Sequence, residues 1–473
     1  MSPARRSGDS AFAPALAPAL APALGRGLRL SLLLALFGVA GAAPVAEPEH
    51  PPLSPKGEQL QRIVQISRSD LRAWGRLADL CDLVGHRLAG SAALDRAVEM
   101  TAGWLREDQQ ENVTAEPVLV PVWRRGAESL SVISPVPRDL SLLGLGGTVG
   151  TPGLEAEVVV LRSFAELSPA VKGKIVVFNS PMRTDLPAIA QYGDAVAFRG
   201  QGASRAAAFG AVAVLVRSVT TRSLYTPHTG SLRYDPAQPQ IPAAAITPED
   251  ADWMERMGRR GQPPRVRLAL GATTAPDVQS HNVLGELRGG KQANEIVVIG
   301  AHLDSWDVGQ GAHDDGAGVV EVVEALRVLR SLGVTPRRTI RVVLFTNEEN
   351  GLRGGGAYAV AHGGEPHKAL LESDLGGGWP LSWSAGGSPA QLEWLRRAAA
   401  PIGLPVEAGG GGADISPFEA KGALVIGLRP DDSHYFDVHH TWADTVDKVD
   451  PVALAEGTAA VAALAWQLAN APD

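Results

Sequence analysis

The stretch GAHLDSWDVGQGAHDDGAGVV, residues 300–320, places two histidines and four aspartates directly after the apolar run IVVI. A carboxylate that is buried without a partner costs several kcal/mol or gives up its charge. The partner can be an arginine, water or a metal ion. Neutral imidazole and carboxylate are ligands that zinc and similar divalent ions accept. A metal site is therefore the first hypothesis for this stretch.

Other acids and histidines follow further apolar runs along the chain. Ligands of parallel sheets bind at the carboxyl ends of the strands, so these residues are expected to meet at one edge. Two histidines and three carboxylates suffice for two ions if one carboxylate bridges them, and paired ions activate water for hydrolysis. The residues at these predicted strand ends and in the adjoining loops are His302, Asp304, Asp314, Asp315, Glu348, Glu349, Asp374, His439, His440 and Asp444.

Two of these segments also predict supporting roles. The adjacent Glu348 and Glu349 supply one metal ligand and one general base, which takes a proton from water and returns it to the leaving amine. Asp304 follows His302 by two positions, so both side chains can point to one face of an extended segment. Asp304 is then expected to fix the tautomer of the imidazole from behind.

Each segment also has a plainer interpretation. The sequence HDDGAG can be a helix N-cap with solvated acids, and a pair of glutamates after a strand is a weak signal by itself. A lone histidine such as His440 is more often a surface or core residue. The combination of five segments with suitable residue types favours the metal site. His313, His362 and His367 are expected to lie outside it, whereas His228 could reach it from an inserted segment.

The elements that must position these residues fill the C-terminal part of the chain. Over residues 278–473, fully apolar strands such as NEIVVIGAH alternate with helical patterns such as AGVVEVVEALRVLRSLG. This alternation predicts an α/β fold with a mainly parallel mixed sheet that helices flank on both faces. Residues 44–134 are expected to add the N-terminal part of the same catalytic domain.

The intervening residues 135–277 have a different pattern. Short β runs such as AEVVVL, GKIVVFN and RVRLAL are separated by Gly and Pro turns and by one helical pattern, GASRAAAFGA. This pattern predicts a small β-rich domain inserted into the larger one.

The N-terminal residues 1–43 have the pattern of a secretory signal peptide. Arginines precede a short apolar run at residues 30–40, and small residues follow it. The run is too short for a comfortable transmembrane helix. We therefore expect a secreted or periplasmic protein, with no stable membrane insertion once the signal is removed.

Composition excludes other classes of protein. The net charge of −8 provides no basic surface, so nucleic acid is not expected as a partner. The single cysteine, Cys81, excludes an intrachain disulfide and a zinc site made of several thiolates. Because it lies in an apolar periodic stretch, Cys81 is predicted to be a buried structural thiol.

The motifs HLDS, DDGAG, NEEN, ESD and HHTWADT, in this order, resemble those of the co-catalytic di-zinc exopeptidases, which include secreted aminopeptidases. The resemblance covers nearly the whole chain after the signal. It implies the zinc exopeptidase fold with an inserted protease-associated domain. It also implies a peptide substrate and two Zn²⁺ ions, and members of this family often form homodimers. Carried over position by position, it implies metal ligands His302, Asp314, Glu349, Asp374 and His440, with Asp314 as the bridge, Glu348 as the base and His439 near the oxyanion.

The function expected from this resemblance is a secreted zinc exopeptidase that hydrolyses dipeptides or short peptides. The alternatives are an aminopeptidase of broad specificity, a glutaminyl-cyclase-like acyltransferase on the same fold, and a binding protein without catalysis. Relatives of the cyclase kind keep one zinc, whereas this chain retains the full two-metal set. Whether the enzyme requires a free amino end or a free carboxyl end stays open. A carboxyl end needs a basic anchor, for which Arg353 and Arg429 are candidates.

Overall fold

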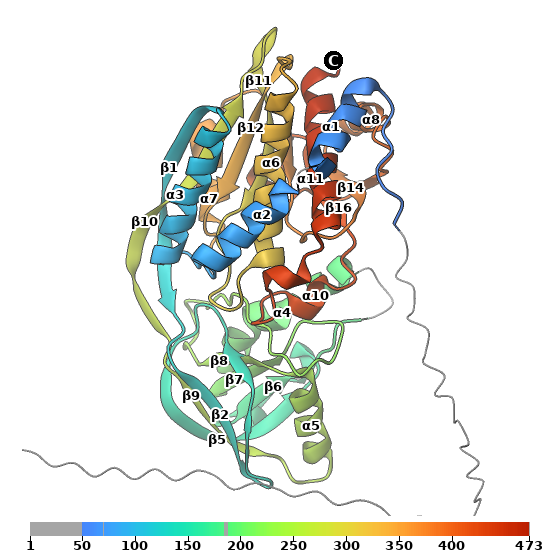
Figure 1. Ribbon diagram of the computed structural model, residues 1–473. Helices are drawn as coiled ribbons and strands as arrows, with labels where there is room; N and C mark the ends of the chain where they lie inside the picture. Colours follow the sequence, from blue (N-terminus) through green and yellow to red (C-terminus); the bar gives the residue numbers. More distant parts are fainter. Residues whose placement is uncertain (1–49, 70, 184–187, 473) are drawn as a thin grey trace, which may run out of the picture. The chain divides into compact units, whose positions relative to one another are not determined.

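Two eight-stranded sheets organise the residues that this computed structural model describes, which are 50–69, 71–183 and 188–472 (Figure 1). The signal peptide predicted for residues 1–43 lies outside the described residues.

The first sheet has the strand order β1-β10-β12-β11-β13-β16-β14-β15. Its four central strands are parallel to one another, whereas β10 and β14 pair with them in antiparallel fashion. The central strands are apolar and buried on both faces, as expected for parallel strands between helices. The strands of this sheet are β1 (Glu111–Arg124), β10 (Thr273–Leu287), β12 (Arg338–Phe345), β11 (Gln292–His302), β13 (His367–Glu372), β16 (Val425–Pro430), β14 (Pro380–Gly386) and β15 (Val406–Ala408).

Helices flank both faces of this sheet, which confirms the predicted α/β class (Figure 1). On one face, apolar side chains of the sheet pack with those of a large helical layer. On the other face, Tyr358 and Phe418 pack on the alternate side chains of the same strands. The helices of the large layer are α1 (Glu58–Ser69), α2 (Arg72–Asp79), α3 (Ala92–Glu107), α6 (Ala317–Ser331), α8 (Pro389–Ala399) and α11 (Pro451–Asn470), and those of the opposite face are α7 (Arg353–His362) and α9 (Ser416–Glu419).

The second sheet has the order β3-β2-β9-β5-β6-β7-β8-β4 and draws its strands from residues 128–270. The chain leaves the first sheet through β1 and returns through β10, and these two strands pair with each other. This part contains two helices, α4 (Ala188–Ala207) and α5 (Pro248–Arg259). The sequence pattern predicted a helix that overlaps α4, but it did not predict α5. The strands are β2 (Glu128–Ser134), β3 (Arg138–Leu140), β4 (Leu142–Gly144), β5 (Thr151–Leu161), β6 (Ile175–Phe178), β7 (Ala213–Arg217), β8 (Ala243–Ile246) and β9 (Arg265–Leu270).

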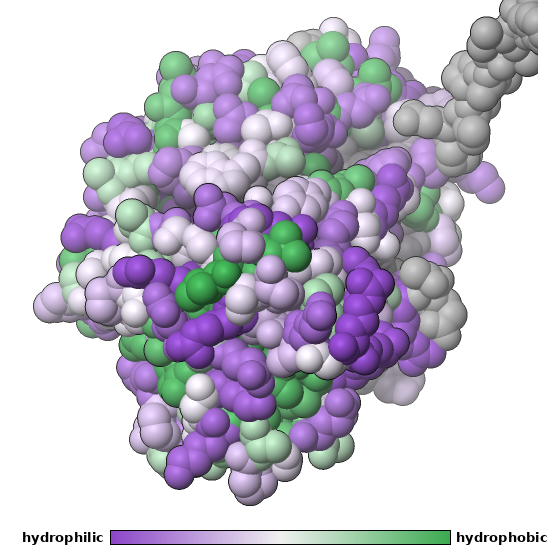
Figure 2. All heavy atoms as spheres, turned by 90° about the horizontal axis from the view of Figure 1, so that it is seen from below, coloured by the Kyte–Doolittle hydropathy of each residue, from purple (hydrophilic) through white to green (hydrophobic). Residues whose placement is uncertain are grey.

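One described helix, α11, is long and apolar enough to cross a membrane by length and composition alone. In its most apolar 18-residue window 89% of the residues are buried, and the helix packs on α6 and α1 as a core helix. Cys81 is buried as predicted, and burial raises the pKa of its thiol to about 12. On the face drawn in Figure 2, hydrophilic side chains are interleaved with small hydrophobic patches.

Candidate active site

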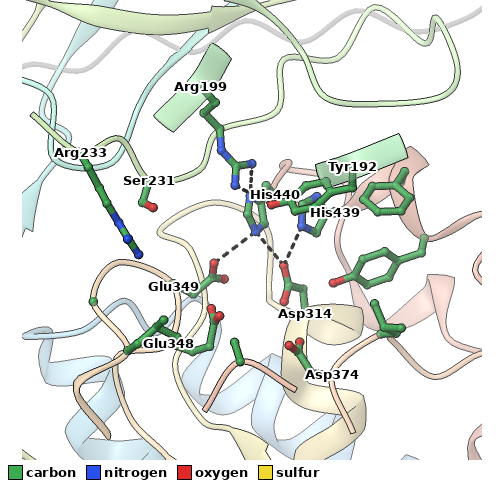
Figure 3. Close-up of a pocket in the computed structure, with 16 residues that line it drawn as sticks. Tyr192, Arg199, Ser231, Arg233, Asp314, Glu348, Glu349, Asp374, His439 and His440 are labelled. Atoms are coloured by element: carbon green, nitrogen blue, oxygen red, sulfur yellow. Dashed lines mark hydrogen bonds and ion pairs between the residues drawn. The ribbon is translucent and has the colours of Figure 1, made fainter. Parts of the chain in front are cut away.

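The structure brings the predicted acids and imidazoles together at the carboxyl ends of the central parallel strands. His302 is the last residue of β11, and Asp374 follows β13 by two residues. The two glutamates lie in the turn after β12, and Asp314 lies in the short helical turn η4 (Ala312–Gly316) before α6. The adjacent histidines 439 and 440 follow the short helix α10 (Tyr435–Val438). His439 and His440 point at one oxygen of the Asp314 carboxylate (Figure 3), and His302 contacts its other oxygen.

One side of this cluster, here named the His302 half, consists of His302, Asp374 and the Asp314 Oδ1 atom. His302 Nε2 lies 3.2 Å from Asp314 Oδ1 and 3.3 Å from Asp374 Oδ1. His302 Nδ1 donates to the carbonyl oxygen of Asp304 at 2.9 Å, which directs Nε2 at the two carboxylates. The expected partner was the Asp304 carboxylate, but its nearest oxygen is 3.9 Å from Nδ1.

The other side, here named the His440 half, consists of His440, Glu349 and the Asp314 Oδ2 atom. His440 Nε2 lies 3.0 Å from Asp314 Oδ2 and 3.2 Å from Glu349 Oε2. His440 Nδ1 lies 3.2 Å from the carbonyl oxygen of Thr229, to which it donates. The second oxygen of Glu349 accepts the backbone N–H of Trp306 at 3.1 Å. Each imidazole is thus oriented by a backbone carbonyl behind it, and each offers Nε2 to the same bridging carboxylate.

The backbone at His440 is strained and is held by the segment that contains Thr229. His440 has a φ of 62°, a left-handed conformation that costs a non-glycine residue about 1–3 kcal/mol. Its carbonyl oxygen accepts the backbone N–H of Thr229 at 3.0 Å. His228 is 2% exposed, and its Nδ1 donates to the carbonyl oxygen of His439 at 2.7 Å. Burial lowers the pKa of His228 to about 3, so the ring is neutral and can donate through Nδ1.

His439 stacks on His440 at a ring-centroid distance of 3.5 Å. Its Nε2 lies 3.6 Å from Asp314 Oδ2, and its buried Nδ1 has no hydrogen-bond partner among the described residues. Burial, reinforced by the charge on His440, lowers the pKa of His439 well below its usual value. His439 is therefore a neutral imidazole at the edge of the cluster.

Glu348 faces the cluster without an ion pair to either histidine among the described residues. Its backbone N–H donates to Asp304 Oδ1 at 3.0 Å. Burial, with the neighbouring carboxylate of Asp374 adding to it, raises the pKa of Glu348 well above its usual value. A carboxylate that is partly withdrawn from water and not paired with a cation has the properties of a general base.

The charges of the cluster favour a cation. Burial opposes the charging of His302, but the Asp314 and Asp374 carboxylates outweigh it and raise the pKa of this imidazole well above its usual value. In the same way, Glu349 and Asp314 overcome burial and raise the pKa of His440 to about 10. Burial raises the pKa of Glu349 itself to about 7. Protons on the imidazoles thus supply positive charge that a metal ion would replace on binding.

A cavity of about 260 Å³ opens beside the cluster. One side of it is lined by residues of the cluster, which are Asp314, Glu348, Glu349, Asp374 and the two adjacent histidines. Its other side is formed by residues from the part of the chain that contains the second sheet, which are Tyr192, Arg199, Ser231 and Arg233 (Figure 3).

The remaining histidines with predicted positions lie outside the ligand cluster. The ring of His313 contacts the backbone at Gly377 and Lys448. His362 pairs with Glu116 on the surface, and His367 contacts Tyr358 on the opposite face of the sheet. Asp315, which neighbours the bridge, accepts the backbone N–H groups of His302 and Gly318 and so fixes the local backbone.

Comparisons with known proteins show the family of this chain. Residues 282–465 match the model of Peptidase family M28. Carboxypeptidase Q of Xenopus laevis is 42% identical over 392 residues, which are 80% of this chain and 82% of that protein. The chain belongs to peptidase family M28. Family membership and this likeness identify it as a metallo-exopeptidase.

Solved structures support the same fold for this M28 peptidase. A peptidase M28 precursor from Shewanella amazonensis SB2B superposes with a TM-score of 0.84 at 38% identity, covering 88% of this chain and 97% of that one. A zinc aminopeptidase from Bacillus subtilis gives a TM-score of 0.63 at 24% identity, covering 85% and 95%. At that identity the second likeness concerns the fold alone.

Several residues around the site of the M28 peptidase were not predicted from the sequence. Arg87 is fully buried and donates to the carbonyl oxygens of Leu303, Gln310 and Gly311 at 2.6, 2.8 and 2.9 Å. It therefore fixes both ends of the loop between His302 and Asp314. Arg199 and Arg233 line the cavity from the other side. The short segment GHRLAGS was recognised only as a loop, and its arginine gave no further signal.

Proposed function

We propose that this M28 peptidase hydrolyses dipeptides or short peptides with two zinc ions, a water molecule and Glu348 as general base. One ion would be held by His302, Asp374 and the bridging Asp314, and the other by Asp314, Glu349 and His440. When bound, the ions would polarise the scissile carbonyl and acidify the attacking water.

The observation that carries this proposal is the twofold use of one carboxylate. His302 Nε2 and His440 Nε2 lie within 3.2 Å of the two different oxygens of Asp314. Asp314 Oδ2 is buried and accepts no hydrogen bond from the described residues. Imidazole nitrogens and carboxylate oxygens suit zinc, and cysteine thiolates are absent from the cluster. The donor set therefore fits a pair of ions that share a bridge.

The residues around the cluster suggest how protons move. Glu348 takes a proton from the attacking water and returns it to the leaving amine, because it faces the cavity and is held through its backbone by Asp304. His439 is a neutral imidazole beside the bridge, and we assign it a place near the developing oxyanion. Asp304 acts through two other residues. Its carbonyl oxygen orients His302, and its Oδ1 accepts the backbone N–H of Glu348.

Three further features belong to this proposal. Residues 135–277 are proposed to act as a protease-associated domain that completes the substrate cavity, which Arg199 and Arg233 of this segment line. Residues 1–43 are proposed as a signal peptide that directs the enzyme out of the cytoplasm. We also propose that the enzyme forms a homodimer in solution.

The decisive experiment replaces Glu348 by Gln. The amide keeps the size of the side chain but cannot take the proton, so kcat should fall by roughly 10²–10⁴-fold while both zinc ions stay bound. Zinc content and hydrolysis of a dipeptide are measured on the same preparation. Glu393→Gln, an exposed position on α8 that pairs with Arg397, is the matched control and should behave as wild type. Full activity of Glu348→Gln with two ions bound would overturn the base assignment.

A further inference from the structure

The cavity has two walls of opposite charge. Glu348, Glu349 and Asp374 form the catalytic wall, and the other wall carries Arg199, Ser231 and Arg233. In Figure 3 these last three residues enter from the top, above the carboxylates. Attack by metal-activated water on a peptide bond does not need a basic wall, so we look for the purpose of this wall in the substrate.

Arg233 is the exposed cation of this wall. Its backbone N–H donates to the carbonyl oxygen of Gly200 at 2.9 Å, which attaches the loop to helix α4. Among the residues that the structure describes, none forms a hydrogen bond or an ion pair with its guanidinium. The side chain instead reaches into the cavity beside Ser231 (Figure 3). A guanidinium in this position is available to an anion from solution.

Arg199 adds a buried positive charge behind the cavity. It is 6% exposed, and its guanidinium donates to the Thr229 carbonyl at 3.3 Å and to the Tyr192 hydroxyl at 2.5 Å. Its Nη1 also lies 3.3 Å from His440 Nδ1. Its buried Nε has no partner, and no described carboxylate lies within ion-pair distance. Gly230 leaves room for it, since a Cβ atom there would lie 2.3 Å from the guanidinium carbon. A buried cation without a counterion favours binding of an anion nearby.

The arginines considered from the sequence do not line this cavity. Arg353 forms an ion pair with Asp277 and contacts the Leu119 carbonyl, and it does not line the cavity. Arg429 lies on β16 and is likewise absent from the lining. The basic groups at the cavity therefore come from the segment that contains the second sheet.

We propose that Arg233, supported by the charge of Arg199, binds the free α-carboxylate of the peptide substrate. This inference rests on the proposed function, because it assigns the substrate class of the same site. A guanidinium can bind a carboxylate through two parallel hydrogen bonds. The cavity of about 260 Å³ is smaller than the roughly 300–1,000 Å³ of sites for drug-sized ligands, which fits a dipeptide.

The test measures binding to zinc-loaded Glu348→Gln protein by calorimetry, so that the ligand is not consumed. The ligands are Ala-Ala, its C-terminal amide and the C-terminal amide of Ala-Glu. Ala-Ala should bind at least tenfold more tightly than its amide. Arg233→Ala in the same background should weaken binding of Ala-Ala by roughly 10–100-fold and leave the amide within threefold, because only the charged hydrogen bonds are lost.

Two variants control for folding and for charge. Arg205 lies on α4, the helix that carries Arg199, but outside the cavity lining, where it stacks on Phe164 and contacts Gln201. Arg205→Ala therefore removes a cation from this helix and should leave ligand binding unchanged. Arg233→Lys keeps the charge without the paired donors and should retain an intermediate preference for the free carboxylate. Zinc content and circular dichroism verify that each variant is folded.

Three results would overturn the inference. The first is equal binding of Ala-Ala and its amide, and the second is a preference that survives unchanged in Arg233→Ala. The third is tight binding of the Ala-Glu amide, which would mean that the arginine binds an acidic side chain instead of the chain end. Hydrolysis by wild-type enzyme separates the two proposals. Cleavage without carboxylate preference refutes only this inference, whereas carboxylate preference without cleavage refutes only the proposed function.

Discussion

The two imidazoles that share Asp314 are oriented by different parts of the chain. His302 donates through Nδ1 to the carbonyl of Asp304, two residues away in its own strand-end loop. His440 donates to the carbonyl of Thr229, which is 211 residues away in the segment that contains the second sheet. The His302 half is thus built by residues outside the segment that contains the second sheet. The His440 half requires a contact from the inserted segment.

This difference has a physical cause. His302 continues a buried strand, so its backbone is fixed by the ladder of β11 with its neighbours. His440 follows a four-residue helix and has a left-handed backbone that would relax without support. The contacts from His228 and Thr229 provide that support. The segment that contains the second sheet therefore both lines the proposed substrate cavity and supports one half of the cluster.

The strongest test of the His302 half is removal of Arg87. Its guanidinium is fully buried and holds three carbonyl oxygens of the loop that joins His302 to Asp314. Arg87→Met leaves these acceptors buried without donors and should lower the free energy of unfolding by roughly 3–5 kcal/mol. Urea unfolding followed by circular dichroism measures it.

Arg96→Met provides the control for this prediction, because Arg96 is exposed on α3 and contacts only the carbonyl of its own helix at Ala92. It should change the unfolding free energy by less than about 0.5 kcal/mol. An equally small effect of Arg87→Met would show that the loop is held by the sheet without this anchor.

The His440 half is tested by replacing His228, which donates to the carbonyl of His439. His228→Leu keeps a similar volume but removes the donor. Of the two zinc ions that we propose, the one at His440 should then bind roughly 10–100-fold more weakly, as is typical when a partner behind a metal ligand is lost. The other ion should change little, because the His302 half has no contact with His228. Competition titration with a chelator measures both affinities.

His228→Asn is the rescue variant, since its side-chain amide can place a donor near the position of Nδ1. It should restore most of the affinity that the Leu variant loses. If the affinities of both zinc ions fall equally in His228→Leu, the two halves are not independent. The conclusion that only the His440 half depends on the inserted segment would then be wrong.

The sequence predicted the His302 half better than its surroundings. An apolar strand followed by polar residues is a local pattern, and parallel strands bring their carboxyl ends to one edge, so His302, Asp314 and Asp374 could be placed together. The four central strands of the first sheet and the helices α6, α8 and α11 were predicted for the same reason, whereas β14, β15, α7 and α9 were not. Helix α5 was missed because the turns around it dominated the pattern of the inserted segment.

The contacts behind the cluster were beyond such reasoning. Arg87 donates to carbonyls more than 200 residues away, and Arg199 contacts the backbone of Thr229. A backbone acceptor leaves no residue type in the sequence that would reveal the pairing. An isolated arginine also has the pattern of a surface residue. Only the folded chain shows that Arg87 is buried and that Arg233 faces the cavity.

The smallest expected effect concerns the support of the His302 half from the core. Glu321 on α6 is fully buried, and its Oε2 accepts the hydroxyl of Ser373, the residue before Asp374, at 2.6 Å. Its Oε1 has no partner among the described residues. Burial raises the pKa of Glu321 to about 8, so the folded protein holds the proton more tightly than the unfolded chain, whose value is near 4.5. Its contribution to stability is therefore full at low pH and is lost as the pH rises from about 4.5 to about 8.

Glu321→Gln mimics the protonated side chain at every pH and should remove this loss. It should match wild type near pH 4.5 and exceed its unfolding free energy by about 1–3 kcal/mol at pH 8. Urea unfolding at both pH values measures the difference, with Glu393→Gln as the exposed control. Because the substitution acts on the core and not on the contact at Thr229, the zinc affinity of the His440 half should stay unchanged. If the zinc affinity of the His440 half falls in Glu321→Gln, both halves depend on the same core. The inserted segment would then not be a separate support.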